Sequence, residues 1–149
     1  MTKAKPTFAR IGTVSEGTLR DEDLISAFAG ELDYYMKRLR LTRNQRKHFA
    51  GLIREATHDE VGSEIVSILE DALQEIAPPY CYFGTAEGDG ACFGFWPSID
   101  DCDLPRLTAG DDIPREHWGE DVLLVNDHGN VSCGYVDRRG RYRAYWDCV

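Results

Sequence analysis

The chain has 149 residues, a length suited to one domain that buries a core without disulfide or metal support. Hydrophobic residues make up 42% and aromatic residues 11% of it, which argues against global disorder, and no run of about eighteen apolar residues is present to span a membrane. The 26 acidic side chains outnumber the 17 basic ones, so the net charge is −9 and general nucleic-acid binding is disfavoured.

An extended arm is expected over residues 1–20, and whether it pairs as an edge strand stays open. Residues 1–12 are basic but lack the apolar region of a secretion signal. A helix is predicted over residues 21–40, because acids begin this segment, bases end it, and apolar residues recur at three- and four-residue steps. The apolar stripe comprises Leu24, Ile25, Phe28, Leu32, Tyr35, Met36 and Leu39.

Two further helices are predicted before Pro78. The second begins at Thr42, which has capping-box spacing to Gln45, and its thinner stripe is Phe49, Leu52, Ile53 and Ala56. The third begins between residues 57 and 60 and ends at Pro78 and Pro79, since proline lacks the amide donor. Its stripe comprises Val61, Ile65, Ile68, Leu69, Ala72, Leu73 and Ile76.

The pattern after Pro79 is typical of β-strands. One hairpin is predicted from residues 80–83 and 91–96 around a glycine-rich loop, and a second from residues 122–125 and 131–136. Residues 97–121 are expected to be irregular, with a short helix near 114–118. A last strand is predicted over residues 141–149, where Tyr142, Ala144 and Trp146 alternate with Arg141, Arg143 and Tyr145.

Helices followed by strands, without βαβ alternation, indicate an α+β fold. We expect one domain over residues 1–149, in which the three helices of residues 21–77 pack on an antiparallel sheet of two consecutive hairpins in residues 80–149. No internal repeat or low-complexity tract divides the chain.

Cysteine and histidine chemistry forms one alternative, that of a small enzyme. The five cysteines lack C-x-x-C spacing and the four histidines are scattered, so we expect free thiols, no metal site and no cofactor. A nucleophile built from Cys133 or Cys102 with His128 or His117 and a carboxylate stays open, although a structural role explains these cysteines more simply. No catalytic residue is assigned.

A basic cluster forms the second alternative, a nucleic-acid binder. Residues 37–54 contain seven basic side chains and no acid: Lys37, Arg38, Arg40, Arg43, Arg46, Lys47 and Arg54. No recognition-helix motif accompanies them, and the many acids elsewhere oppose phosphate binding. We therefore favour the cluster as a complement to the acidic half of the chain, within one molecule or in a homodimer.

The acidic excess gives the favoured hypothesis, an interaction protein that is not an enzyme. Residues 59–127 hold seventeen acids against Arg106 and Arg115. Carboxylates at such density can occupy a basic surface of a nucleic-acid-handling protein, and tryptophans can strengthen the contact. The candidate partner-binding residues are Glu87, Asp89, Trp96, Asp100, Asp101, Asp103, Asp111, Asp112, Glu116, Trp118, Glu120 and Asp121.

Three stretches add a resemblance. Residues 12–25 (GTVSEGTLRDEDLI), 88–96 (GDGACFGFW) and 122–131 (VLLVNDHGNV) resemble uncharacterised proteins encoded on bacteriophages and other bacterial mobile elements. The resemblance implies a bacterial cytoplasm and carries no activity or site residues. Small acidic proteins of that origin include inhibitors of host defence, some of which block nucleic-acid grooves of CRISPR effectors, so by analogy it favours an inhibitor.

Overall fold

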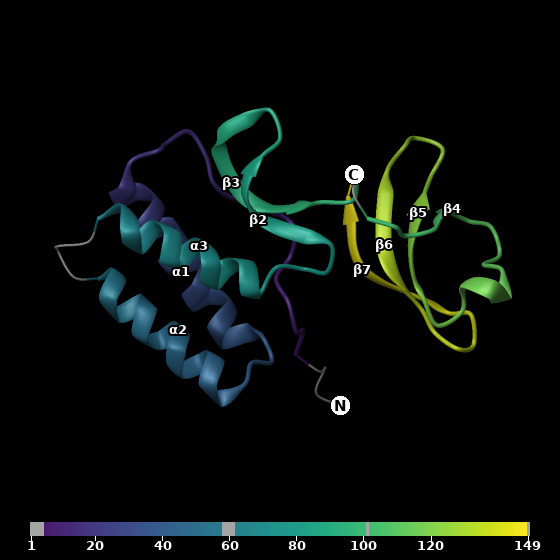
Figure 1. Cartoon of the computed structure of the whole chain (residues 1–149), viewed down its shortest axis with the longest axis horizontal. Coiled ribbons are helices and arrows are strands. Elements are labelled where there is room, and N and C mark those ends of the chain that lie inside the picture. Colours follow the sequence, from purple (N-terminus) through teal and green to yellow (C-terminus); the bar gives the residue numbers. More distant parts are fainter. Residues whose placement is uncertain (1–4, 58–61, 101, 149) are drawn as a thin grey trace. The chain divides into compact units, whose positions relative to one another are not determined.

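The computed structural model describes residues 5–57, 62–100 and 102–148, and it has the mixed helical and strand content of an α+β protein (Figure 1). The chain divides into two compact units, Met1–Trp96 and Pro97–Val149, here called the first and second units. The single domain expected over residues 1–149 stays a prediction. Among the described residues, no helix is long and apolar enough to cross a membrane.

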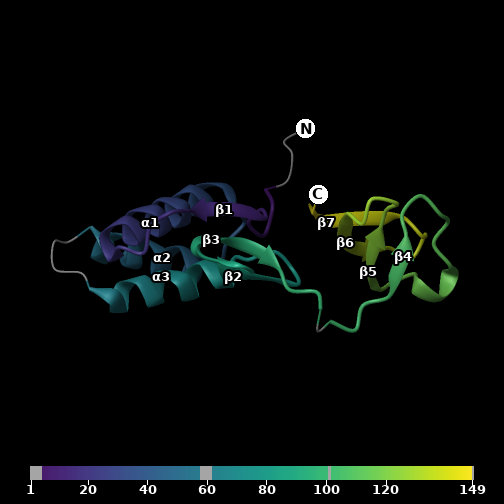
Figure 2. The same cartoon turned by 90° about the horizontal axis from the view of Figure 1, so that it is seen from above.

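The first unit contains three α-helices and a three-stranded sheet. The helices are α1 (Asp21–Arg38), α2 (Arg43–Ala56) and α3 (Ser63–Glu75). The strands are β1 (Gly12–Ser15), β2 (Cys81–Ala86) and β3 (Asp89–Pro97), in the order β1-β3-β2 (Figure 2).

The predicted stripe of α1 forms the centre of the first unit's core. Phe28 is fully buried, and its ring meets those of Phe83 and Phe93 edge to face, with centroids 5.1 and 5.3 Å apart. Tyr35 makes the same kind of contact with Phe95 at 6.0 Å. The aromatic side chains of the small sheet are therefore covered by α1, and this burial stabilises both elements.

The capping box predicted at the start of α2 is confirmed. The Thr42 hydroxyl accepts from the Gln45 backbone N–H at 3.1 Å, and the Gln45 side chain accepts from the Thr42 N–H at 3.0 Å. Two backbone donors that a helix start leaves unpaired are thus satisfied by two side chains.

Thr42→Ala is expected to lower the free energy of unfolding of the first unit by about 1 kcal/mol, because the first turn of α2 loses its cap. Urea unfolding followed by ellipticity at 222 nm measures the change. Thr42→Ser keeps the hydroxyl and serves as the control. Equal destabilisation by both substitutions would show that the cap is not the cause.

The buried face of α3 matches the predicted stripe at Leu69, Ala72, Leu73 and Ile76 and differs from it at two positions, Val66 and Ile68. The helix begins at Ser63, with Gly62 as its N-cap, and residues 58–61 lie outside the described part of the chain. Val66, Leu69, Leu73 and Ile76 are buried, whereas Ile68 is 40% exposed. Steps of three, four and three residues define a narrow face on a helix, and Ile68 falls beside that face.

The N-terminal arm does pair as an edge strand. β1 lies antiparallel to β3, with Gly12 opposite Phe95. Gly94 permits the approach, because a Cβ there would collide with the Gly12 carbonyl oxygen and lie 2.9 Å from the Trp96 ring. β2 and β3 are joined by a tight turn at Glu87 and Gly88, shorter than the predicted loop.

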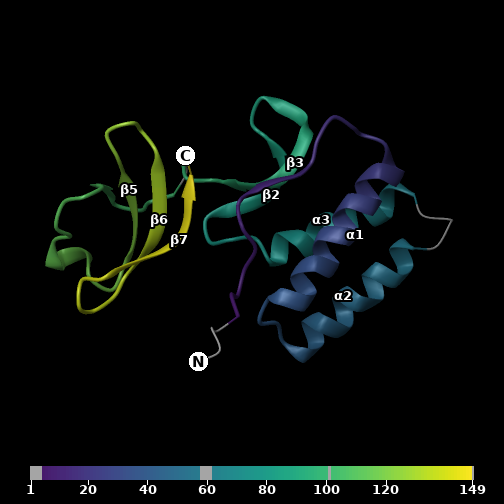
Figure 3. The ribbon, with the colours of Figure 1, turned by 180° about the vertical axis from the view of Figure 1, so that it is seen from behind.

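The second unit is a separate four-stranded sheet, so the two predicted hairpins belong to different sheets (Figure 3). Its strands, in spatial order, are β4 (Arg106–Thr108), β5 (Asp121–Val125), β6 (Val131–Val136) and β7 (Tyr142–Cys148). β5, β6 and β7 pair antiparallel, whereas β4, which the sequence pattern did not predict, pairs parallel to β5. The short helix expected near 114–118 is a single 3-10 turn at Arg115–His117.

A bulge breaks the alternation predicted for β7. Cys133 faces Trp146 and Gly134 faces Ala144, so Tyr145 is the extra residue between them. An extra residue moves the following side chains to the opposite face. Trp146 is accordingly buried while Ala144 is exposed.

Candidate functional site

The candidate acidic residues are divided between the two units. Glu87 and Asp89 are exposed at the β2–β3 turn, and Trp96 lies near the end of β3, all in the first unit. The other residues belong to the second unit, except that Asp101 lies outside the described residues. The second unit therefore carries most of the candidate partner-binding residues.

Four carboxylates of the second unit are exposed and unpaired. Asp100 and Asp103 lie in the segment before β4, and Asp111 and Asp112 follow it. Within the described part of the chain, none of the four forms an ion pair. We call these four residues the acidic face, a name that groups them by charge and exposure. The field of exposed carboxylates that form no ion pair reaches approaching molecules.

Glu116 and Glu120 flank an imidazole instead. Nε2 of His117 lies 3.6 Å from Glu116, and its Nδ1 lies 3.3 Å from Glu120. The 3-10 turn and its exit bring these three side chains together. These two carboxylates are therefore engaged with a side chain of their own unit.

Asp121 has an internal role. It is half-buried at the start of β5, and its Oδ1 accepts a hydrogen bond of 2.7 Å from the Tyr145 hydroxyl. The bulge at Tyr145 on β7 brings this donor to β5 across the intervening strand. This carboxylate thus ties together strands of the second sheet.

Both candidate tryptophans are half-buried and donate hydrogen bonds within their own units. The Trp96 indole donates to the Gly84 carbonyl and the Trp118 indole to the Ile113 carbonyl, each at 3.1 Å. The Trp118 ring also lies against Gly140, where a Cβ would be 2.6 Å from it. The Trp96 indole therefore links β3 to β2, the Trp118 indole holds a loop of the second unit, and the contact of either with a partner stays a prediction.

Four basic side chains of the second unit lie on the β6–β7 turn and β7, whereas Arg106 lies on β4 and Arg115 on the 3-10 turn. The four are Arg138, Arg139, Arg141 and Arg143, and all are exposed. Asp137 organises the turn by accepting from the Arg141 and Arg139 backbone N–H groups at 2.9 and 2.8 Å, and these bonds lower the pKa of Asp137. The second unit thus carries a group of exposed arginines at its β6–β7 turn and on β7, beside Asp137 and Asp147.

The thiol alternative loses its first candidate. Cys133 is fully buried, and burial raises the pKa of its thiol to about 12, so the nucleophilic thiolate is disfavoured. The Cys102 thiol donates to the Ile99 carbonyl at 3.0 Å. Among the described residues, no three His, Cys, Asp or Glu side chains are placed to hold a metal ion.

The basic cluster of residues 37–54 has partly structural roles. Arg46 donates to the Met36 and Leu39 carbonyls at 2.8 and 3.2 Å, which satisfies acceptors at the end of α1. Lys37 pairs with Asp33 at 3.0 Å, and the Arg38 guanidinium lies 3.7 Å from the centroid of the Tyr34 ring. Arg40, Arg43, Lys47 and Arg54 are exposed.

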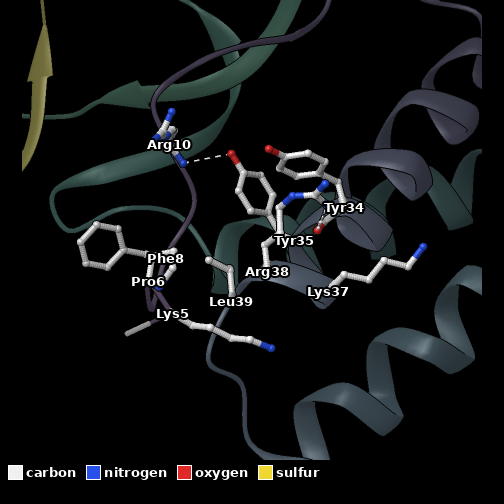
Figure 4. Close-up of a pocket in the computed structure, with 9 residues that line it drawn as sticks. All are labelled: Lys5, Pro6, Phe8, Arg10, Tyr34, Tyr35, Lys37, Arg38 and Leu39. Atoms are coloured by element: carbon white, nitrogen blue, oxygen red, sulfur yellow. Dashed lines mark hydrogen bonds between the residues drawn. The ribbon is translucent and has the colours of Figure 1, made fainter. Parts of the chain in front are cut away.

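The first unit contains a cationic pocket that the sequence did not predict. Its volume is about 630 Å³, and its walls come from residues 5–10 of the arm and from the end of α1 (Figure 4). The lining residues are Lys5, Pro6, Phe8, Arg10, Tyr34, Tyr35, Lys37, Arg38 and Leu39. The Tyr, Lys and Arg residues at positions 34–38 could have indicated one wall of the pocket. Nothing in the sequence showed that the arm lies against the end of α1.

Comparison with models of protein families, with curated proteins and with solved structures finds no match to this chain. Its function must therefore be argued from its own residues.

Proposed function

We propose that this chain is an interaction protein that is not an enzyme, and that its second unit docks on a basic surface of a nucleic-acid-handling protein. The observation that carries the proposal is the acidic face of Asp100, Asp103, Asp111 and Asp112, exposed and without ion pairs among the described residues. Unpaired carboxylates offer a phosphate-like charge to a basic groove.

The energetics favour recognition by charge. Surface carboxylates steer association with a basic partner and select it by sign, while like-charged molecules are repelled. In the free protein these carboxylates stay hydrated, so their exposure carries no desolvation cost before a partner binds. Binding of this kind weakens with ionic strength, since exposed charges are screened over about 8 Å at physiological salt.

An analogy suggests which class of partner this chain binds. The resemblance of residues 12–25, 88–96 and 122–131 to proteins of bacteriophages and mobile elements supports a bacterial partner in a host defence complex, of which CRISPR effectors are one type. Such an inhibitor would act in the bacterial cytoplasm and occupy the groove that nucleic acid otherwise fills. A homodimer is compatible with this proposal.

Neutralising the acidic face is expected to reduce partner recovery at least about tenfold, a loss of about 1.4 kcal/mol or more. The variant carries Asp→Asn at positions 100, 103, 111 and 112. Wild-type and variant proteins are used to purify partners from nuclease-treated bacterial lysate, and quantitative mass spectrometry compares the bound proteins. The proteins lost from the variant should carry basic nucleic-acid-binding surfaces.

A second variant has the same charge change in the first unit, with Gln or Asn at the exposed Glu55, Glu64, Asp71 and Glu75. It is expected to recover the partners as the wild type does. An equal loss of partner recovery in both variants would show that net charge, and not the acidic face, causes the effect. Unchanged recovery with the acidic face neutralised would refute the proposal.

A further inference from the structure

The cationic pocket of the first unit is built from two segments that are distant in sequence. The arm contributes residues 5–10, and the end of α1 contributes residues 34–39. Its volume of about 630 Å³ falls within the range of sites for small molecules. Figure 4 shows the side chains of Arg10, Tyr34, Tyr35 and Arg38 gathered on one side of the opening between these segments.

Three hydrogen bonds hold the arm in place. The Arg40 N–H donates to the Pro6 carbonyl at 2.8 Å, and the Ala9 N–H donates to the Ile76 carbonyl at 2.7 Å. The Arg10 N–H donates to the Tyr35 hydroxyl at 3.1 Å. Because Ala9 is also buried, the arm is attached both to α1 and to the end of α3, and the pocket is formed before a ligand binds.

The charge of the pocket is positive. Lys5, Arg10, Lys37 and Arg38 contribute to its walls, and no carboxylate is among the lining residues. Lys37 is paired with Asp33, while Lys5 and Arg10 have no ion pair within the described part of the chain. A ligand with a negative charge is therefore required to complement this lining.

The end of α1 does not cancel that charge. Carbonyl groups at a helix C-terminus repel anions, but here the Tyr34, Met36 and Leu39 carbonyls accept bonds from Arg38 and Arg46. The Arg38 bond is 3.1 Å long, and it holds the guanidinium over the Tyr34 ring. Arg38 is thus oriented before any ligand arrives.

Aromatic groups supply the other half of the site. The Tyr34 side chain is 46% exposed, and Phe8 lies on the opposite segment. The Tyr35 hydroxyl accepts from Arg10 and keeps its own proton, because burial raises the pKa of this phenol. The pocket therefore combines cations, a hydroxyl donor and flat apolar surfaces on which an aromatic ring can stack.

We propose that this pocket binds a ligand of mononucleotide size, with its phosphate held by Arg10 and Arg38 and its base stacked against Tyr34. Guanidinium groups match phosphate oxygens in pairs, and tyrosine or phenylalanine accepts any base because every base has a π-face. This site lies wholly in the first unit and is independent of the acidic face.

Isothermal titration calorimetry of the full chain with the four nucleoside monophosphates tests the proposal. At least one is expected to bind with a Kd below about 1 mM, and the matching nucleoside should bind at least about tenfold more weakly, a difference of about 1.4 kcal/mol. Arg10→Gln and Arg38→Gln are each expected to raise the Kd for the monophosphate by about tenfold as well. Inorganic phosphate alone should bind more weakly than the monophosphate.

Lys47→Gln removes the same charge from an exposed position on α2 outside the pocket and is expected to leave the Kd unchanged. Thermal melting confirms that each variant remains folded. The proposal is overturned if no monophosphate binds at 5 mM, about five times the expected limit. It is also overturned if the nucleoside binds equally well, if Lys47→Gln has the same effect as Arg10→Gln, or if only a ten-residue oligothymidylate binds.

Discussion

Phe28→Ala is expected to lower the free energy of unfolding of the first unit by about 3–5 kcal/mol. The side chain is fully buried, and its ring joins α1 to both strands of the β2–β3 hairpin through Phe83 and Phe93. Its removal eliminates buried apolar surface and leaves a cavity that three packed elements can fill only in part. A loss of this size can exceed the margin by which a small unit is stable.

Urea unfolding followed by ellipticity at 222 nm measures this loss, because all three α-helices belong to the first unit. Leu19→Ala is the control, since Leu19 is 65% exposed and its truncation is expected to change the free energy by no more than about 0.5 kcal/mol. A loss below about 1 kcal/mol for Phe28→Ala would show that the aromatic cluster does not hold the unit together.

Gly134→Ala is expected to destabilise the second unit by about 2–3 kcal/mol. A Cβ at this position of β6 would lie 2.7 Å from the Tyr142 ring and closer still to the Arg143 carbonyl oxygen of β7. Backbone oxygen cannot move away without breaking the pairing of β6 with β7 beside the bulge. The clash therefore acts on the pairing of the inner strand β6 with the edge strand β7.

Hydrogen exchange of amides in β6 and β7 measures this effect, because those amides are protected by the pairing that the clash opposes. Gly30→Ala makes the same chemical change on the exposed side of α1, where a Cβ meets nothing within 4 Å. It is expected to stabilise the first unit by up to about 1 kcal/mol, since alanine favours helix. Unchanged protection in Gly134→Ala would contradict the predicted clash.

Local elements were predicted well from the sequence. The apolar stripe of α1, the capping box at Thr42 and the turn after Pro114 follow from spacings of three to five residues. The stripe of α3 was predicted correctly at Leu69, Ala72, Leu73 and Ile76, but Val66 was missed and Ile68 was wrongly included, because Ile65, Val66, Ile68 and Leu69 offer two overlapping apolar faces. Only packing against α1 selects between such faces.

For the candidate surface, the sequence predicted which residues are acidic or aromatic but not which contacts they make. The sequence identified the acids of residues 87–121, but not that Glu116 and Glu120 flank His117 or that Asp121 accepts from Tyr145. Both tryptophans are likewise engaged with carbonyl groups of their own units. Hydrogen bonds of this kind depend on turns and bulges that no charge pattern describes.

By itself the sequence determined the α+β composition, the three helices, the strands of the two hairpins and the concentration of acids in residues 59–127, because these depend on neighbours within a few turns of chain. Only the tertiary structure decided that β1 joins β3, that β4 joins β5 in parallel, and that the two hairpins belong to different sheets. It also decided that residues 5–10 and 34–39 form one pocket. These features join segments distant along the chain, and their energies come from packing and pairing rather than from local propensity.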